Sequence, residues 1–238
     1  MSYLADRADQ DGFVVDAVLD ERVAFIRRVY AHLLGAVLLF VAASAVIVKT
    51  GVLVGPMLNL IAAGQWWLIL IAFLGGTWVA QRMAQSEAGP AVQYAGLGLY
   101  ALLEAAIFAP LLTIISMRMN GPDLILQAGT VTLLIFGGLT AIVMLTRTDF
   151  SFLRNILWLG SLAALGLMVV SFFAGFSLGL LFVCGMIVLM SGYILYETSG
   201  VLHHFRTDQH VAASLALFAS LATLFWYVLQ LMSILDRD

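Results

Sequence analysis

Long apolar runs dominate this sequence and leave few folds open to it. Seven stretches of roughly 20 residues are almost free of charge, and about 20 apolar residues in a helix cross the hydrocarbon of a bilayer. Backbone polar groups in hydrocarbon must be satisfied within the segment, which favours helices, and strand-like alternation is absent. The runs are Val29–Val48, Ile61–Ala80, Val92–Met117, Leu124–Leu145, Ile156–Phe173, Leu178–Tyr196 and Val211–Leu235.

Composition supports this interpretation. Of the 238 residues, 63% are hydrophobic and 11% are charged, whereas soluble domains are roughly 45–50% apolar and about 25% charged. One soluble core of this size cannot bury so much apolar surface. We therefore predict an all-α integral membrane protein with seven transmembrane helices, whose main surrounding is the lipid bilayer. The net charge of −3 provides no basic face for nucleic acid.

The basic residues predict the orientation in the membrane. With seven spans, the N-terminal side collects eight arginines and the opposite side has three basic residues. Basic residues favour the cytoplasmic side, so we expect a cytoplasmic N-terminus and an external C-terminus. The two sets are Arg7, Arg22, Arg27, Arg28, Arg82, Arg147, Arg154 and Arg206, against Lys49, Arg118 and Arg237. Residues 1–25 are predicted to form an acidic cytoplasmic tail and residues 26–238 the transmembrane domain.

Glu104 lies near the middle of the third apolar run. A charge in hydrocarbon costs a few kcal/mol, so a persistent ionisable residue there is a functional candidate. Two interpretations stay open. The carboxyl group keeps its proton and bonds to a neighbouring helix, or it forms a proton or cation site beside a cavity.

Glu197 ends the sixth run and Arg82 ends the second, both on the predicted cytoplasmic side. Position alone favours an exposed loop carboxylate for Glu197. Arginine at a helix end usually extends toward the headgroups and anchors the topology. If the fold brings the two residues together, they form a charged contact at the cytoplasmic mouth.

Metal and enzyme interpretations find little support. His203, His204 and His210 share a loop, but no HExxH pattern or acidic ligand set accompanies them, and His32 is expected to be a packing residue. The sequence has no Walker A motif either, and we expect no catalytic site, no metal and no cofactor.

The order of these features resembles the Bax inhibitor-one family, the transmembrane Bax inhibitor motif proteins, including its bacterial members. The resemblance spans residues 20 to 235, and each segment is weak alone. The segments are Glu21–Tyr30, Thr130–Thr140 with Thr148–Leu153, Gly192–Thr198 and Ala213–Ile234.

The resemblance implies six helices around a central last helix and a calcium leak activity gated by pH. In that family, acids on the sixth and last helices share a proton, and an arginine on the second helix contacts one of them. Here Glu197 matches the sixth-helix acid, but Ser220 stands where the second acid is expected. Arg82 matches the arginine to within one residue, with Gln81 as the other candidate. Glu104 is our own candidate for a replacement carboxyl group.

Two functions follow from this pattern. The first is a cation leak for calcium or protons, with Glu197, Arg82, Ser220 and Glu104 controlling the path. The second is a non-conducting regulator that binds a membrane protein partner, such as a protease complex, which suits the loss of the second acid. In a bacterium either protein would lie in the inner membrane.

Overall fold

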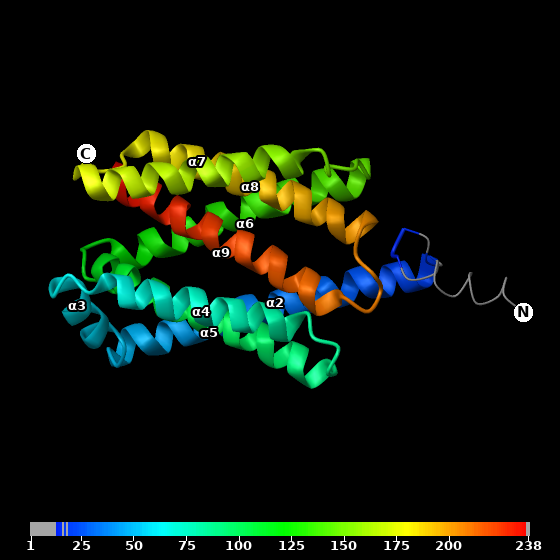
Figure 1. Ribbon diagram of the computed structural model, residues 1–238, viewed down its shortest axis with the longest axis horizontal. Coiled ribbons are helices and arrows are strands. Elements are labelled where there is room, and N and C mark those ends of the chain that lie inside the picture. The colour runs from blue at the N-terminus through cyan, green and yellow to red at the C-terminus, as the bar shows by residue number, and fades with distance from the viewer. Residues whose placement is uncertain (1–12, 16, 18, 237–238) are drawn as a thin grey trace, which may run out of the picture. The chain divides into compact units, whose positions relative to one another are not determined.

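The computed structural model describes residues 13–15, 17 and 19–236, and helices make up most of this part of the chain (Figure 1). Seven of the helices are long and apolar enough to cross a membrane, which confirms the predicted fold class. The helices are α2 (Leu19–Thr50), α3 (Val54–Ala62), α4 (Trp66–Ala84), α5 (Pro90–Ser116), α6 (Gly121–Thr146), α7 (Leu153–Ala174), α8 (Leu180–His203) and α9 (His210–Leu235). Arg7 and Arg237, which entered the orientation prediction, lie outside the described part, as does most of the predicted acidic tail before residue 19.

Three helix boundaries differ most from the sequence prediction. The second span begins at Trp66, because Gly64 adopts a left-handed conformation with φ 73° and separates α3 from α4. Helix α2 begins at Leu19, within the segment assigned to the acidic tail, and Asp20 and Glu21 occupy its first turn. Acidic side chains there complement the positive end of the helix dipole. Helix α8 continues to His203, so Glu197 lies inside a helix and does not end it.

The chain forms two compact units. Among the described residues, the first contains 13–15, 123–205 and 219–236, and the second contains 17, 19–122 and 206–218. Helix α9 therefore contributes its first turns to the second unit and the remainder to the first. The arrangement of six helices around a central last helix stays a prediction.

In the second unit, α5 packs against both α2 and α4 (Figure 1). Gly96 allows α5 to approach α4 closely, because a Cβ atom at this position would lie 2.6 Å from the carbonyl oxygen of Ala80. Aromatic rings pack between α5 and α2, where Phe40 of α2 meets Phe108 of α5 edge-on, with the ring centroids 5.1 Å apart. Ser214, in the first turns of α9, donates a hydrogen bond to the carbonyl of Val29 at 2.9 Å.

In the first unit, α7 packs beside α8 (Figure 1). The hydroxyl groups of Ser161 and Tyr193 are hydrogen-bonded at 2.9 Å across this pair. Phe182 of α8 also meets Tyr227 of α9, with the ring centroids 6.3 Å apart. These contacts hold α8 between α7 and the second part of α9.

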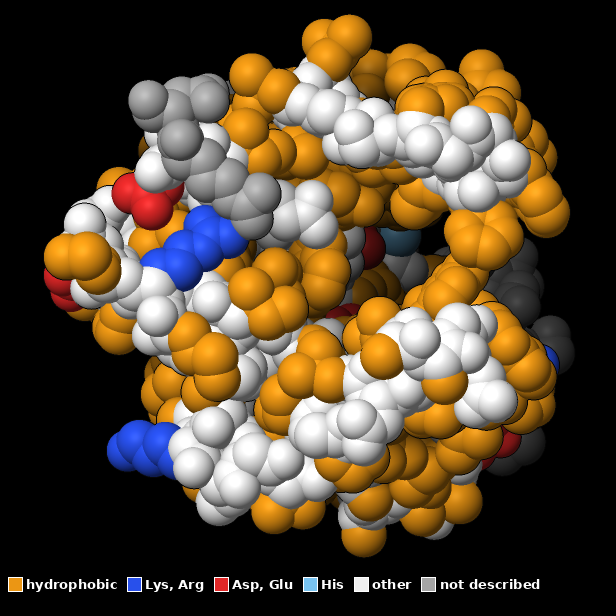
Figure 2. All heavy atoms as spheres, turned by 90° about the vertical axis from the view of Figure 1, so that its left-hand side faces the viewer, with side chains coloured by type: hydrophobic (Ala, Val, Ile, Leu, Met, Phe, Trp, Pro, Cys, Tyr) orange, Lys and Arg blue, Asp and Glu red, His pale blue; other side chains and the backbone are white. Residues whose placement is uncertain are grey.

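The helices expose large apolar side chains over much of their length. Leu145, Phe173 and Leu181 are each more than 80% exposed, at 84%, 82% and 88%. On the face shown in Figure 2, hydrophobic side chains are widespread among backbone and uncharged polar groups, and charged side chains are few. Exposed apolar surface of this extent suits hydrocarbon as the surrounding medium.

Candidate functional site: a carboxyl group paired with a serine

Glu197 and Ser220, two of the four residues proposed from the sequence, meet within the first unit. Ser220 of α9 is 6% exposed, and its side chain is hydrogen-bonded to the Glu197 carboxyl group. The second carboxyl oxygen, Oε2, is buried and has no hydrogen-bond partner among the described residues. Glu197 is therefore not the exposed loop carboxylate that its position in the sequence suggested.

This geometry determines what the pair can do chemically. A neutral carboxylic acid tolerates an apolar site, whereas a carboxylate with an unpartnered buried oxygen is costly. Ionisation of Glu197 would therefore favour any rearrangement that supplies water, a cation or another donor. The pair alone is a poor calcium site, because calcium takes about 6–8 oxygen ligands. Among the described residues, no three His, Cys, Asp or Glu side chains converge as metal ligands would.

Glu104 belongs to the second unit and has a partner on its own helix. It is 5% exposed, and its carboxyl group is hydrogen-bonded to the side chain of Tyr100, one turn earlier on α5. The Tyr100 ring in turn meets Phe218 edge-on at 6.1 Å. The first interpretation of Glu104 expected a hydrogen bond to a neighbouring helix. The structure gives the carboxyl group a hydrogen-bonded partner, but this partner lies on the same helix.

Arg82 also belongs to the second unit, where it is exposed in the last turn of α4. Its guanidinium carbon lies 5.3 Å from the centre of the Trp78 ring, a cation–π contact within the same helix. A charged contact between Arg82 and Glu197 joins residues of different units and stays a prediction.

Sequence reasoning missed a polar cluster beside Glu197. Asp149, in the segment between α6 and α7, accepts hydrogen bonds through Oδ1 from the Ser151 N–H at 2.9 Å and from Ser199 Oγ at 3.2 Å. His204 Nε2 lies 3.3 Å from the same oxygen. The Phe150 N–H also donates to Ser199 Oγ at 2.9 Å. The cluster therefore attaches the α6–α7 segment to the end of α8 that carries Glu197.

The cluster has a direct electrostatic consequence. The Ser151 backbone N–H is the main cause that lowers the pKa of the Asp149 carboxyl group below its usual range, and the nearby His204 adds to this effect. The signals in the sequence were slight: an Asp just after an apolar run, and a Ser and a His about 50 residues later. Only the fold brings these residues together.

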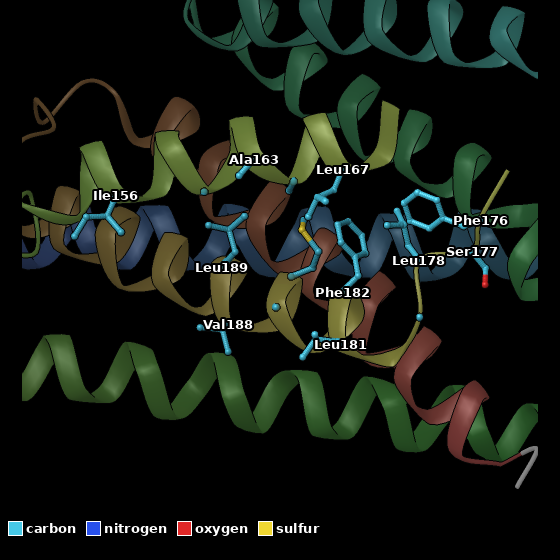
Figure 3. A pocket seen from close by; sticks show the side chains of 15 residues that line it. Ile156, Ala163, Leu167, Phe176, Ser177, Leu178, Leu181, Phe182, Val188 and Leu189 are labelled. Carbon is cyan, nitrogen blue, oxygen red and sulfur yellow. The ribbon is translucent and has the colours of Figure 1, made fainter. Parts of the chain in front are cut away.

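A groove between α7 and α8 is a separate feature (Figure 3). Its volume is about 540 Å³, and Leu167, Phe182 and Leu189 are among the side chains that line it. Neither Glu197 nor Ser220 lines the groove. Ser177 is the single polar side chain in the lining, so the groove offers no ligand set for an ion.

Comparison with known proteins places the chain in a family. The sequence profile of the family described as "Inhibitor of apoptosis-promoting Bax1" matches residues 22–237. The Escherichia coli K12 protein named Modulator of FtsH protease YccA is 30% identical over 215 residues, which are 90% of this chain and 91% of YccA. Bax inhibitor 1 of Schizosaccharomyces pombe is 27% identical over 243 residues, covering 94% of this chain and 82% of its own.

Mouse Protein lifeguard 4 is 26% identical over 243 residues, which cover 99% of this chain and 95% of its own length. The matched residues extend over nearly all of the helices described above. The family resemblance inferred from four short segments is therefore confirmed. This protein is a multi-pass membrane protein that belongs to the Bax inhibitor-1 family.

Proposed function

We propose that this protein is a cation leak, with calcium as the expected ion, whose opening depends on the protonation of Glu197. One observation carries the proposal: a carboxyl group with a buried, unpartnered oxygen lies where α8 meets α9. When this group is neutral, its burial at the helix contact is tolerated. When it is charged, the contact becomes less stable. A rearranged state that admits water or a cation then becomes more populated. Calcium is taken from the family resemblance.

The test is calcium flux into sealed vesicles that contain the purified protein. We expect the flux of the unmodified protein to change between pH 5 and pH 8. Glu197→Gln, which keeps the shape and removes the charge, should make the flux independent of pH. Glu87→Gln removes an exposed carboxylate between α4 and α5 and serves as the matched control. Absence of flux at every pH would rule the proposal out.

A second candidate is a regulator of a membrane protease, and two observations favour it. The relative YccA is named as a modulator of FtsH protease, and position 220 carries a serine that cannot share a proton with Glu197 as a second acid would. In this case the protein would conduct nothing and would form a complex with FtsH in the inner membrane. The rate at which FtsH degrades a membrane substrate, measured with and without this protein, distinguishes the two candidates.

We propose no catalytic role. Ser199 and His204 both contact the Asp149 carboxylate, whereas in a serine nucleophile triad the histidine lies between the serine and the acid. The Ser199 hydroxyl is occupied as an acceptor from Phe150 and a donor to Asp149. The cluster has the pattern of a structural contact.

A further inference from the structure

A groove in the second unit has one polar end and one apolar end. It lies between α2 and α5, and its volume is about 380 Å³. His32 and Tyr94 line one part, and Leu39, Leu97 and Gly98 line another. None of these residues belongs to the Glu197 site.

Two rings, from α2 and α5, line the polar end, and a third ring from α9 lies beside them. The His32 ring stacks on the Tyr94 ring, with centroids 5.0 Å apart and an angle of 20° between the planes. The His210 ring lies 5.0 Å from His32. His32 Nδ1 is 2.7 Å from the carbonyl oxygen of Arg28, so this nitrogen is the donor and Nε2 remains available as an acceptor or, once protonated, as a donor.

Positive charge accompanies this end of the groove. Arg28 is exposed on α2, one turn before His32, and lies within electrostatic range of His210. The acidic residue that acts on His210 is Asp208. Asp208 is itself paired with Arg206 at 3.5 Å. The rim therefore favours an anion.

The apolar end has room because of glycine. A Cβ atom added to Gly35 would meet nothing within 4 Å, and one added to Gly98 would only touch Leu39 at 3.8 Å. Gly35 lies one turn further along α2 than His32, in the direction away from Arg28. An occupant that extends from the rim along α2 would therefore pass from a cationic and aromatic environment into an apolar one.

The level of the groove in the membrane suits a lipid headgroup. Helix α2 has 32 residues, or about 48 Å at 1.5 Å per residue, while the hydrocarbon is about 30 Å thick. Its charged first turns, which include Arg27 and Arg28, must then lie outside the hydrocarbon. His32 follows directly, at the level where headgroups and aromatic side chains gather. Basic pockets between transmembrane helices are known headgroup sites.

We propose that this groove binds an anionic phospholipid, with its phosphate beside Arg28, His32 and Tyr94 and one acyl chain over Gly35. The cationic rim selects the negative headgroup, and the open space along Gly35 and Gly98 takes the chain. The proposal goes beyond the cation leak and uses none of its residues, so either can fail without the other.

The test measures lipid binding to the purified protein in detergent by native mass spectrometry and by the shift in thermal unfolding. Phosphatidylglycerol is compared with phosphatidylcholine of the same acyl chains and with inorganic phosphate. We expect phosphatidylglycerol to bind and to raise the unfolding temperature. Gly35→Leu fills the groove, and displacing two buried methylene groups should weaken binding by roughly tenfold. Gly75→Leu, at another glycine with nothing within 4 Å, should bind as the unmodified protein does.

A second pair of variants keeps the test independent of the folding of Gly35→Leu. Arg28→Gln changes an exposed side chain at the rim, and Arg154→Gln changes an exposed arginine at the start of α7. Only the first should weaken phosphatidylglycerol binding. Equal binding by both glycine variants, or by both arginine variants, would overturn the proposal. So would a stabilisation that phosphatidylcholine or inorganic phosphate reproduces in full.

Discussion

Position 220 decides how many protonatable groups surround Glu197. The family resemblance places an acid there, and two neighbouring acids would hold one proton between them. In this protein the partner is the Ser220 hydroxyl, which donates or accepts a hydrogen bond but does not titrate. Any dependence on protonation at this contact between α8 and α9 therefore rests on one carboxyl group.

Ser220→Ala should destabilise the packing of α8 against α9. The substitution removes the bonded partner of a buried carboxyl group, and hydrogen bonds between membrane helices contribute about 1 kcal/mol each. Thr223→Ala is the matched control, because the Thr223 hydroxyl is bonded to the Ala219 carbonyl of its own helix at 2.8 Å. Thermal unfolding in detergent measures both. Equal losses would show that the Ser220 contact contributes nothing across the helices.

Asp149 should make stability depend on acid pH. Its pKa is lowered in the folded protein, chiefly by the Ser151 N–H. The stabilisation is therefore complete above the ordinary aspartate pKa of about 4 and is lost as the pH falls through the lowered value. Asp149→Asn should unfold at a lower temperature than the unmodified protein at pH 7.

The difference between Asp149→Asn and the unmodified protein should become smaller below pH 4, because protonation then makes Asp149 neutral, as the asparagine is at every pH. Unfolding temperatures measured from pH 3 to pH 7 test this expectation, with Glu87→Gln as a control for the loss of an exposed carboxylate. A difference that stays constant over this range would mean that the charge of Asp149 is not involved. The effect should be small, because both Asp149 and His204 are exposed.

At the scale of helices, the second unit depends on the close approach of α4 and α5. A Cβ atom at Gly96 would lie 2.6 Å from both the Ala80 oxygen and the Ala84 nitrogen. Both are backbone atoms and cannot move aside without moving the helix. Small residues at such positions are the usual basis of helix association in membranes, where apolar side chains gain little by leaving lipid.

Gly96→Ala should therefore destabilise the protein by about 1–3 kcal/mol, although alanine is the better helix former, because the added methyl group separates α4 from α5. Gly98→Ala is the matched control on the same helix, since its nearest contact would be an ordinary 3.8 Å from Leu39. Thermal unfolding measures the two variants. If both were equally stable, the helices would not be in the close contact described.

For the whole molecule, the charge distribution predicts one orientation. Seven spans with the arginine-rich side inside place the α4–α5 loop in the cytoplasm and the α5–α6 loop outside. A Cys184→Ser background removes the single native cysteine. In this background, Met119→Cys in the α5–α6 loop should react with an impermeant thiol reagent in intact cells. Glu87→Cys should react only after the membrane is opened, and the reverse pattern would invert the topology.

The sequence alone determined that this is a membrane protein of seven helical spans, because the length of an apolar run is a local property and hydrocarbon imposes helices on it. Four short segments were enough to identify the family, since each retains its order along the chain. The sequence also selected Glu197 and Ser220, but through the family resemblance, and the contact between them was not derivable from spacing.

Only the tertiary structure decided which polar atoms have partners. The rotation of the helices decides that Glu197 Oε2 has no hydrogen-bond partner and that Glu104 is bonded to Tyr100. The cluster around Asp149 depends on contact between segments about 50 residues apart. Apolar runs in lipid lack the polar face that reveals helix orientation in soluble proteins. The physical reason is that the sequence of a uniformly apolar helix does not indicate which of its faces points inward. Packing against the neighbouring helices selects one rotation about the helix axis.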